Sequence, residues 1–113
     1  MLTELNAYRQ SVLDLYLRLP DTPRRFSRND LRLVRQLWER EVPLRIVEAA
    51  FLLASARRGT RRPDAIPLGR IRSLHYFVPV IEELLAQPVP ESYVAYLRGK
   101  VQMRPATHAA AAR

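Results

Sequence analysis

The residues that could perform catalytic chemistry are few and poorly arranged for it. The chain has two histidines, His75 and His108, and no cysteine. No carboxylate stands three or four residues from His75, and no histidine pair has the helical spacing that binds a metal ion. Adjacent side chains diverge on a helix, so Glu82 and Glu83 do not share a proton. We therefore expect a non-enzymatic protein that needs no metal and no cofactor, in which His75 has a structural or surface role.

Arginine is the residue type that offers binding chemistry. Of the 19 basic residues all but Lys100 are arginine, against 11 acidic residues, and the formal net charge is +8. Residues 21–62 hold eleven arginines and five acids, whereas the first 20 residues are neutral. The planar guanidinium grips phosphate through paired hydrogen bonds and stacks on bases. A positive charge focused in this way favours polyanionic partners.

The densest basic run is RRGTRR at residues 57–62, with four arginines in six residues. This run is predicted to span the end of a helix and the loop after it, and such a segment can lie along a phosphate backbone. Arg28 stands in the first turn of a predicted helix, where the helix dipole disfavours a cation, which points to an external anion. The alternative is a solvated surface that keeps the protein soluble. The predicted phosphate-binding residues are Arg57, Arg58, Arg61, Arg62, Arg70, Arg72, Arg24, Arg25 and Arg28.

Most of the aromatic residues fall on apolar stripes, so core packing is their expected role. Tyr76, Tyr93 and Tyr96 are the candidates for facing outward, because aromatic residues next to one another or three apart cannot all point inward. An exposed tyrosine near arginine can stack on the bases of a single strand. It can equally form a contact with a protein partner, since Tyr and Arg are enriched in interfaces.

Apolar residues recur at helical spacing throughout, and no segment alternates like a strand. We expect an all-α fold, a single compact bundle of four to five helices around one core. Ser27 and Asp30 resemble a capping box at the start of the second helix, and Arg35 is spaced to pair with Glu39. In the fourth helix, Pro79 predicts a kink, with a break into two helices as the alternative. The predicted helices cover residues 3–19, a segment after Ser27, and residues 43–58, 68–86 and 91–100.

The chain is expected to form one helical domain over residues 1–103, followed by a flexible, alanine-rich tail over residues 104–113. The absence of a signal-peptide pattern and of a long apolar run predicts a cytoplasmic protein that does not enter a membrane. Leucines off the main apolar stripes predict surface for self-association, and hence a possible homo-oligomer. These leucines are Leu17, Leu33, Leu44 and Leu53.

Residues 26–31 (FSRNDL) and 37–50 (LWEREVPLRIVEAA) resemble the helical C-terminal domain of DnaD-type primosomal proteins. The resemblance covers about residues 8–86. It implies binding to DNA and to replication or helicase-loading proteins, on a plasmid or another mobile element. A later helix of that family carries a Tyr-x3-Ile-x3-Trp motif. Here Tyr76, Val80 and Leu84 have its spacing without the tryptophan.

Together these patterns predict a basic helical protein that binds nucleic acid through its phosphates, with DNA favoured over RNA by the resemblance. Base-specific readout is not expected, because no recognition helix with interleaved Asn, Gln and Arg is evident. The alternative is a protein–protein adaptor or a small helical subunit of a ribonucleoprotein complex. The sequence leaves open whether the nucleic acid is single- or double-stranded.

Overall fold

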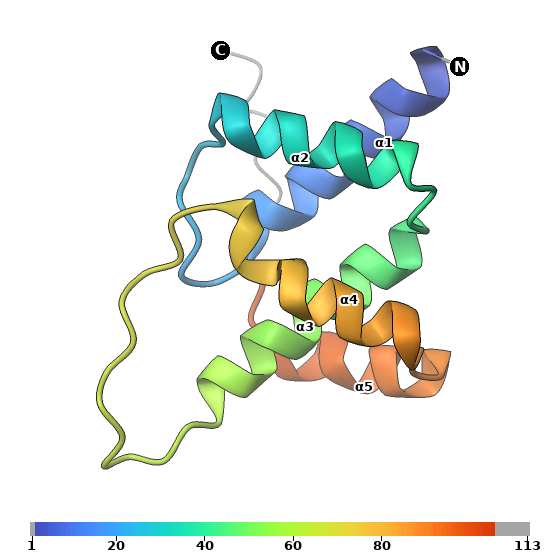
Figure 1. The fold of residues 1–113 in the computed structure, drawn as a ribbon. Helices are drawn as coiled ribbons and strands as arrows, with labels where there is room; N and C mark the ends of the chain where they lie inside the picture. The colour runs from blue at the N-terminus through green and yellow to red at the C-terminus, as the bar shows by residue number, and fades with distance from the viewer. Residues whose placement is uncertain (1, 106–113) are drawn as a thin grey trace.

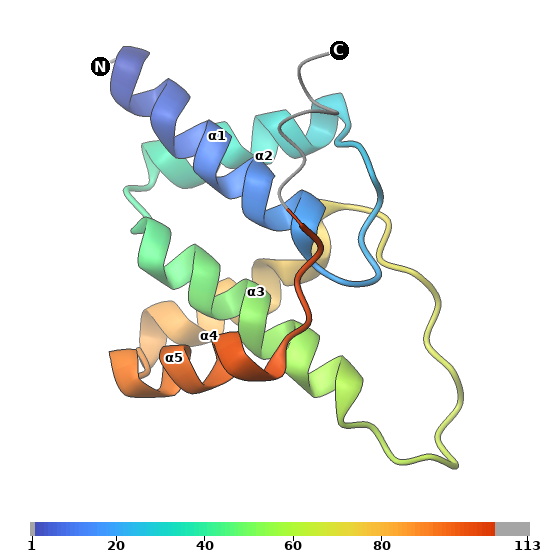
Figure 2. The same ribbon diagram turned by 180° about the vertical axis from the view of Figure 1, so that it is seen from behind.

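A computed structural model describes residues 2–105 and builds them from helices alone, with no strand in that range (Figure 1). The third helix, α3, lies at the centre and packs against α1, α4, α5 and the short 3₁₀ helix η1 (Figure 2). The predicted all-α bundle is confirmed. The elements are α1 (Leu2–Arg18), α2 (Arg28–Glu39), α3 (Leu44–Gly59), η1 (Leu74–Phe77), α4 (Val78–Ala86) and α5 (Glu91–Lys100).

The core forms around α3 because that helix is apolar on nearly every side. Residues 49–55 are all buried, which is typical of a helix enclosed by others rather than one lying on a surface. Phe51 packs against Phe77 of η1 with ring centroids 4.8 Å apart, and Tyr16 of α1 meets Phe77 edge-on at 6.2 Å. Three elements distant in sequence therefore share one aromatic cluster.

The start of α2 is held by Asp30, whose side chain is almost fully buried. The predicted capping box is confirmed: the Ser27 N–H donates to Asp30 Oδ2 at 2.8 Å, and the Asp30 N–H donates to Ser27 Oγ at 3.1 Å. The other oxygen, Oδ1, accepts the backbone N–H of Leu74 at 2.9 Å. One carboxylate therefore caps α2 and fixes the first residue of η1 against it.

The predicted continuous fourth helix over residues 68–86, kinked at Pro79, is wrong, and the alternative of a break into two helices is closer to the structure, in which η1 is followed by α4. Residues 68–73 are irregular, η1 begins at Leu74, and Pro79 lies in the first turn of α4. Proline is tolerated there because the first residues of a helix need no intrahelical N–H donor. The backbone N–H groups of Ile71 and Leu74 donate to Asp21 and Asp30, so neither makes the i−4 hydrogen bond that a helix running from residue 68 through Leu74 would require.

The segment after α5 returns to the end of α1 and bonds it. The guanidinium of Arg104 donates to the carbonyl oxygens of Leu19 and Thr22, and its backbone N–H donates to the Arg18 carbonyl. Arg18 Nε in turn donates to the Arg104 carbonyl at 2.9 Å. Figure 2 shows this segment running from α5 to the end of α1. Residues 106–113 of the predicted tail lie outside the described residues.

Three of the four leucines expected to leave surface for self-association are buried or partly buried. Leu33 and Leu53 are buried in the core, and Leu17 is partly buried against it. Only Leu44 of that set is exposed. Leu33 and Leu53 lie off the main apolar stripes. They are nevertheless buried, because α2 and α3 each pack against more than one other element.

Replacing Asp30 with alanine is expected to destabilise the fold by about 2–4 kcal/mol, because it removes one hydrogen bond of the capping box and leaves the buried N–H of Leu74 without a partner. Ser27→Ala is the matched control, since it removes only the other hydrogen bond of the capping box and costs about 1 kcal/mol. Urea unfolding followed by circular dichroism measures both. Equal losses in the two variants would show that the bond to Leu74 contributes nothing.

Candidate nucleic-acid interface

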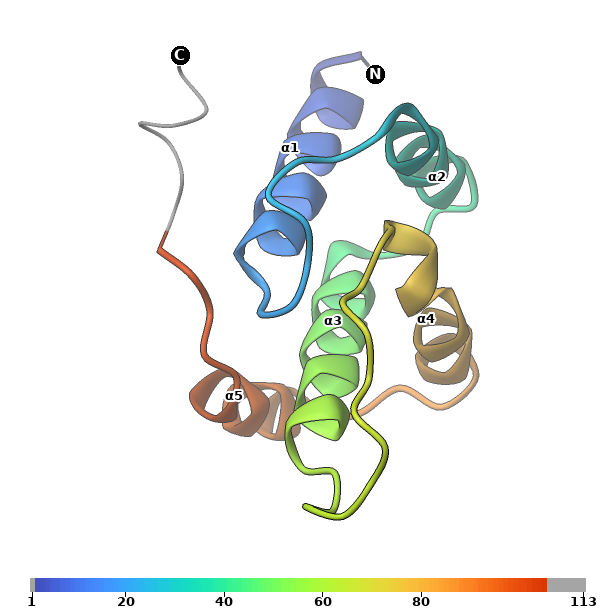
Figure 3. The ribbon, with the colours of Figure 1, turned by 90° about the vertical axis from the view of Figure 1, so that its left-hand side faces the viewer.

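Two loops lie side by side at one edge of the bundle, the first over residues 19–27 and the second over residues 60–73 (Figure 3). They are joined by a hydrogen bond in which the Ile71 N–H donates to the Asp21 carbonyl at 2.9 Å. The first loop is shaped by Thr22, whose buried hydroxyl donates to the carbonyl oxygens at the end of α1. The two loops are therefore held next to each other.

Four predicted binding residues meet on these loops: Arg24, Arg25, Arg70 and Arg72. We call them the loop arginines. All four are exposed, and none has a hydrogen bond or ion pair within the described part of the chain. They therefore carry uncompensated charge on two adjacent loops.

Arg104 shows that the two loops bring their charges close together. The pKa of the Arg104 guanidinium is lowered from its usual value, first by burial and then by the positive charges of Arg24 and Arg70, while Asp21 acts in the opposite direction. Like charges disfavour a cation in this way only when they lie near it. Arg104 therefore belongs to this basic cluster, and the sequence did not indicate it because it lies in the expected tail.

Arg58 lies close to the loop arginines, but its guanidinium group contacts other residues of the protein. Its side chain is only 10% exposed. It donates to the Gly69 carbonyl at 2.7 Å and to the Tyr76 hydroxyl at 3.2 Å, and it lies 3.5 Å from an Asp21 oxygen. Its guanidinium carbon also stands 5.3 Å from the centre of the Tyr76 ring. Arg58 therefore links α3 to both loops.

Arg57 is also paired, in its case with α4. Its two terminal nitrogens donate to both oxygens of Glu83 at 3.0 and 2.7 Å. Arg40 grips Glu82 of α4 in the same bidentate manner, at 2.8 and 3.1 Å. Arg98 of α5 does the same with Glu48 of α3, and it also bonds Glu91. The acids of α3, α4 and α5 therefore neutralise the arginines around them.

Arg61 and Arg62 lie in the second loop, beyond the end of α3. Arg61 donates to the Ile66 carbonyl of its own loop at 2.7 Å, and Arg62 stands 3.5 Å from an Asp64 oxygen. Both arginines are exposed, and Arg62 remains 85% exposed despite its partner. Arg61 and Arg62 are therefore accessible to solvent, but each has a partner within the second loop. The four residues named the loop arginines have no such partner among the described residues.

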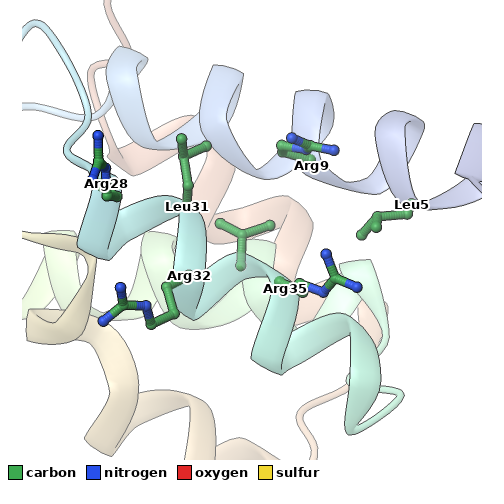
Figure 4. Close-up of a pocket in the computed structure, with 7 residues that line it drawn as sticks. Leu5, Arg9, Arg28, Leu31, Arg32 and Arg35 are labelled. Atoms are coloured by element: carbon green, nitrogen blue, oxygen red, sulfur yellow. The ribbon is translucent and has the colours of Figure 1, made fainter.

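Arg28 lines a second basic feature, a groove of about 310 Å³ between α1 and α2 (Figure 4). Arg28 and Arg32 have no hydrogen bond or ion pair among the described residues, whereas Arg9 bonds Asn6 and Arg35 pairs with Glu39, as predicted. The sequence pattern puts Arg28, Arg32 and Arg35 on one face of α2, but nothing in it indicates Arg9 on the facing helix. The apolar floor consists of Leu5, Leu31 and Val34.

The three predicted outward tyrosines are all exposed, but they do not form one site. Tyr76 lies beside Arg58, in a groove with Leu68 and Val80. Tyr93 and Tyr96 lie together on α5, with ring centroids 6.0 Å apart and planes 19° from parallel. Their groove is a separate one, between α3 and α5.

Other kinds of site find little support in the described residues. His75 is exposed, and no group of three or more His, Cys, Asp or Glu side chains gathers there to hold a metal ion. Over the same range, no helix combines the length and apolar character that crossing a membrane requires. Arginine and tyrosine therefore remain the residues with binding potential.

Comparison with protein-family models, with curated proteins and with solved structures finds no match for this chain.

The pairs made by Glu82 and Glu83 predict a loss of stability in acid. Hydrogen bonds from Arg40 and Arg57 lower the pKa of these carboxylates below their usual value of 4.5. A carboxylate with a lowered folded-state pKa stabilises the fold above its unfolded value and loses that contribution as pH falls through the folded value. The unfolding free energy should fall below about pH 4.5 more steeply in the wild type than in a Glu82→Gln, Glu83→Gln variant. Parallel pH profiles from urea unfolding would contradict this.

Proposed function

We propose that this chain is a non-enzymatic protein that binds nucleic acid by holding its phosphate backbone on the loop arginines. The observation that carries this proposal is the presence of four unpaired arginines on two loops that a hydrogen bond joins. Two of them, Arg24 and Arg70, lie close enough to Arg104 to add to the lowering of its pKa by burial. A planar guanidinium binds phosphate through paired hydrogen bonds, and a polyanion contacts several such groups at once.

The distribution of paired and unpaired arginines supports the same proposal. Seven arginines have neither a hydrogen bond nor an ion pair among the described residues, and six of them lie within residues 24–32 and 70–72. The seventh, Arg45, lies in the first turn of α3. Solubility alone requires charged residues spread over the surface. It does not require that the unpaired arginines lie in neighbouring segments while the other arginines are paired with acids.

DNA is the favoured nucleic acid, and a replication or helicase-loading protein the favoured partner, because of the resemblance to the DnaD-type helical domain. On this proposal, Arg24, Arg25, Arg70 and Arg72 make the main contacts. Arg61, Arg62 and Arg28 support them at the margins. Arg57 and Arg58 contribute less, because their hydrogen-bonding capacity is directed to Glu83 and Gly69.

Removing two loop arginines tests the proposal. An Arg24→Ala, Arg70→Ala variant should bind labelled DNA and RNA more weakly by a similar factor for every sequence. Its salt dependence should be shallower by about 0.7–0.9 in slope for each phosphate that the variant no longer binds. Fluorescence anisotropy across a salt series measures both quantities. Folding is expected to be retained, because the substitution relieves repulsion around Arg104.

Arg45→Ala is the matched control, since it removes an equally unpaired arginine from a different part of the surface. It should leave the affinity and the salt slope near their wild-type values. An unchanged slope in the Arg24, Arg70 variant, or an equal loss in the control, would contradict phosphate contact by the loops.

A second candidate function is an adaptor that binds an acidic protein segment in the groove between α1 and α2. The observation that favours it is the combination of an apolar floor with two unpaired arginines, Arg28 and Arg32 (Figure 4). Phosphate contact needs no apolar floor. An amphipathic acidic helix would place leucines on Leu5 and Leu31 and carboxylates on the arginines.

A labelled helical peptide with glutamates on one face and leucines on the other serves as the probe for this groove. It should bind the wild type and bind an Arg28→Glu, Arg32→Glu variant far more weakly, and a lysine-for-glutamate peptide should not bind. If the double variant instead loses DNA affinity and the peptide never binds, the groove belongs to the nucleic-acid surface. Purified protein that carries the absorbance of nucleic acid, removable by high salt, would favour the first function.

A further inference from the structure

A groove between α3 and α5 includes two of the predicted outward tyrosines, Tyr93 and Tyr96. Its volume is about 600 Å³, within the range of about 300–1,000 Å³ in which proteins hold small ligands. Apolar residues of both helices, such as Leu53 and Leu97, line it. Tyr93, Tyr96 and Lys100 of α5 also line it, and none of the residues along it is acidic.

The two tyrosines form an aromatic surface that the core does not use. Tyr93 is 37% exposed and Tyr96 is 56% exposed. Their rings are nearly parallel, and Lys100 Nζ stands 5.7 Å from the centre of the Tyr96 ring. Neither hydroxyl has a hydrogen bond within the described residues. Exposed aromatic faces beside a cation fit a ligand that is both flat and negatively charged.

The groove leads to the basic cluster. Pro20, which lines one end of it, is four residues before Arg24 in the first loop. Val101 lines the same groove, and the chain runs from it to Arg104, which bonds that loop. The backbone that lines the groove at Pro20 and Val101 therefore continues into the basic cluster.

We propose that this groove receives unpaired bases, so that the ligand is single-stranded nucleic acid with bases on Tyr93 and Tyr96 and phosphates on the loop arginines. This inference rests on the proposed function and specifies its ligand. The bases of a duplex are stacked on one another and offer no free face to a tyrosine ring. Base stacking on aromatic side chains tolerates any sequence, which agrees with the absence of a recognition helix.

The experiment compares three ligands of equal length: a single strand, the corresponding duplex, and an abasic strand that keeps the phosphates but lacks the bases. The wild type should bind the single strand more tightly than either of the others. Tyr96→Ala and Tyr93→Ala should each weaken binding to the single strand by about 5- to 100-fold, and leave binding to the abasic strand unchanged. Their salt slopes should match the wild type, because the phosphate contacts remain.

Tyr96→Phe is the matched control, because it keeps the ring and removes only a hydroxyl that has no partner among the described residues. It should bind the single strand within about twofold of the wild type, since stacking uses the ring face. Circular dichroism establishes that each variant folds, which is expected because both tyrosines are exposed. A loss of affinity in the phenylalanine variant equal to that of alanine would overturn stacking as the cause.

The outcomes separate this inference from the proposed function. Equal wild-type affinity for the intact and abasic strands, or tyrosine variants that bind the single strand normally, would overturn the stacking groove and leave phosphate binding in place. The groove would then be a surface for a protein partner. Absence of binding to all three ligands at low salt would overturn the proposed function and this inference together.

Discussion

The arrangement of this protein depends on one buried carboxylate. Asp30 receives a hydrogen bond from Ser27 on one oxygen and from Leu74 on the other, so the start of α2 and the start of η1 share a single anchor. Because η1 is placed there, Phe77 enters the aromatic cluster beneath it, and the second loop must return past Asp21 of the first. The two basic loops are neighbours as a consequence of this packing.

Electrostatic balance differs between the two sides of the bundle. Around α4 and α5, each of Glu48, Glu82 and Glu83 is gripped by two nitrogens of one arginine, so charge is matched locally. Pairs of this kind add little stability at an exposed surface. Their larger effect is on where charge stays unpaired: four of the seven unpaired arginines among the described residues lie on the two loops.

The sequence predicted what local chemistry determines and missed what distant contacts determine. The capping box at Ser27 and the Arg35–Glu39 pair follow from spacings of three and four residues, and both are present. The apolar spacing through Ile71 continued the helical period, yet that residue's N–H bonds a carbonyl fifty residues earlier in the chain. For the same reason the roles of Arg58 and Arg104 were hidden, because their partners lie far away in sequence. Adjacent loop arginines required the fold before they could be recognised as a group.

On the proposed function, binding of nucleic acid to the basic cluster should also stabilise the folded protein. Arg104 is partly buried and bonded to the first loop, and the charges of Arg24 and Arg70 oppose its own. That repulsion is present in the free protein and is offset, among the described residues, by Asp21, which also pairs with Arg58. A phosphate between the two loops would replace repulsion with attraction, and a ligand that binds only the folded state stabilises it. The same side chains that attract the polyanion therefore tie its binding to the packing of the loops, and through Asp30 to the core beneath them.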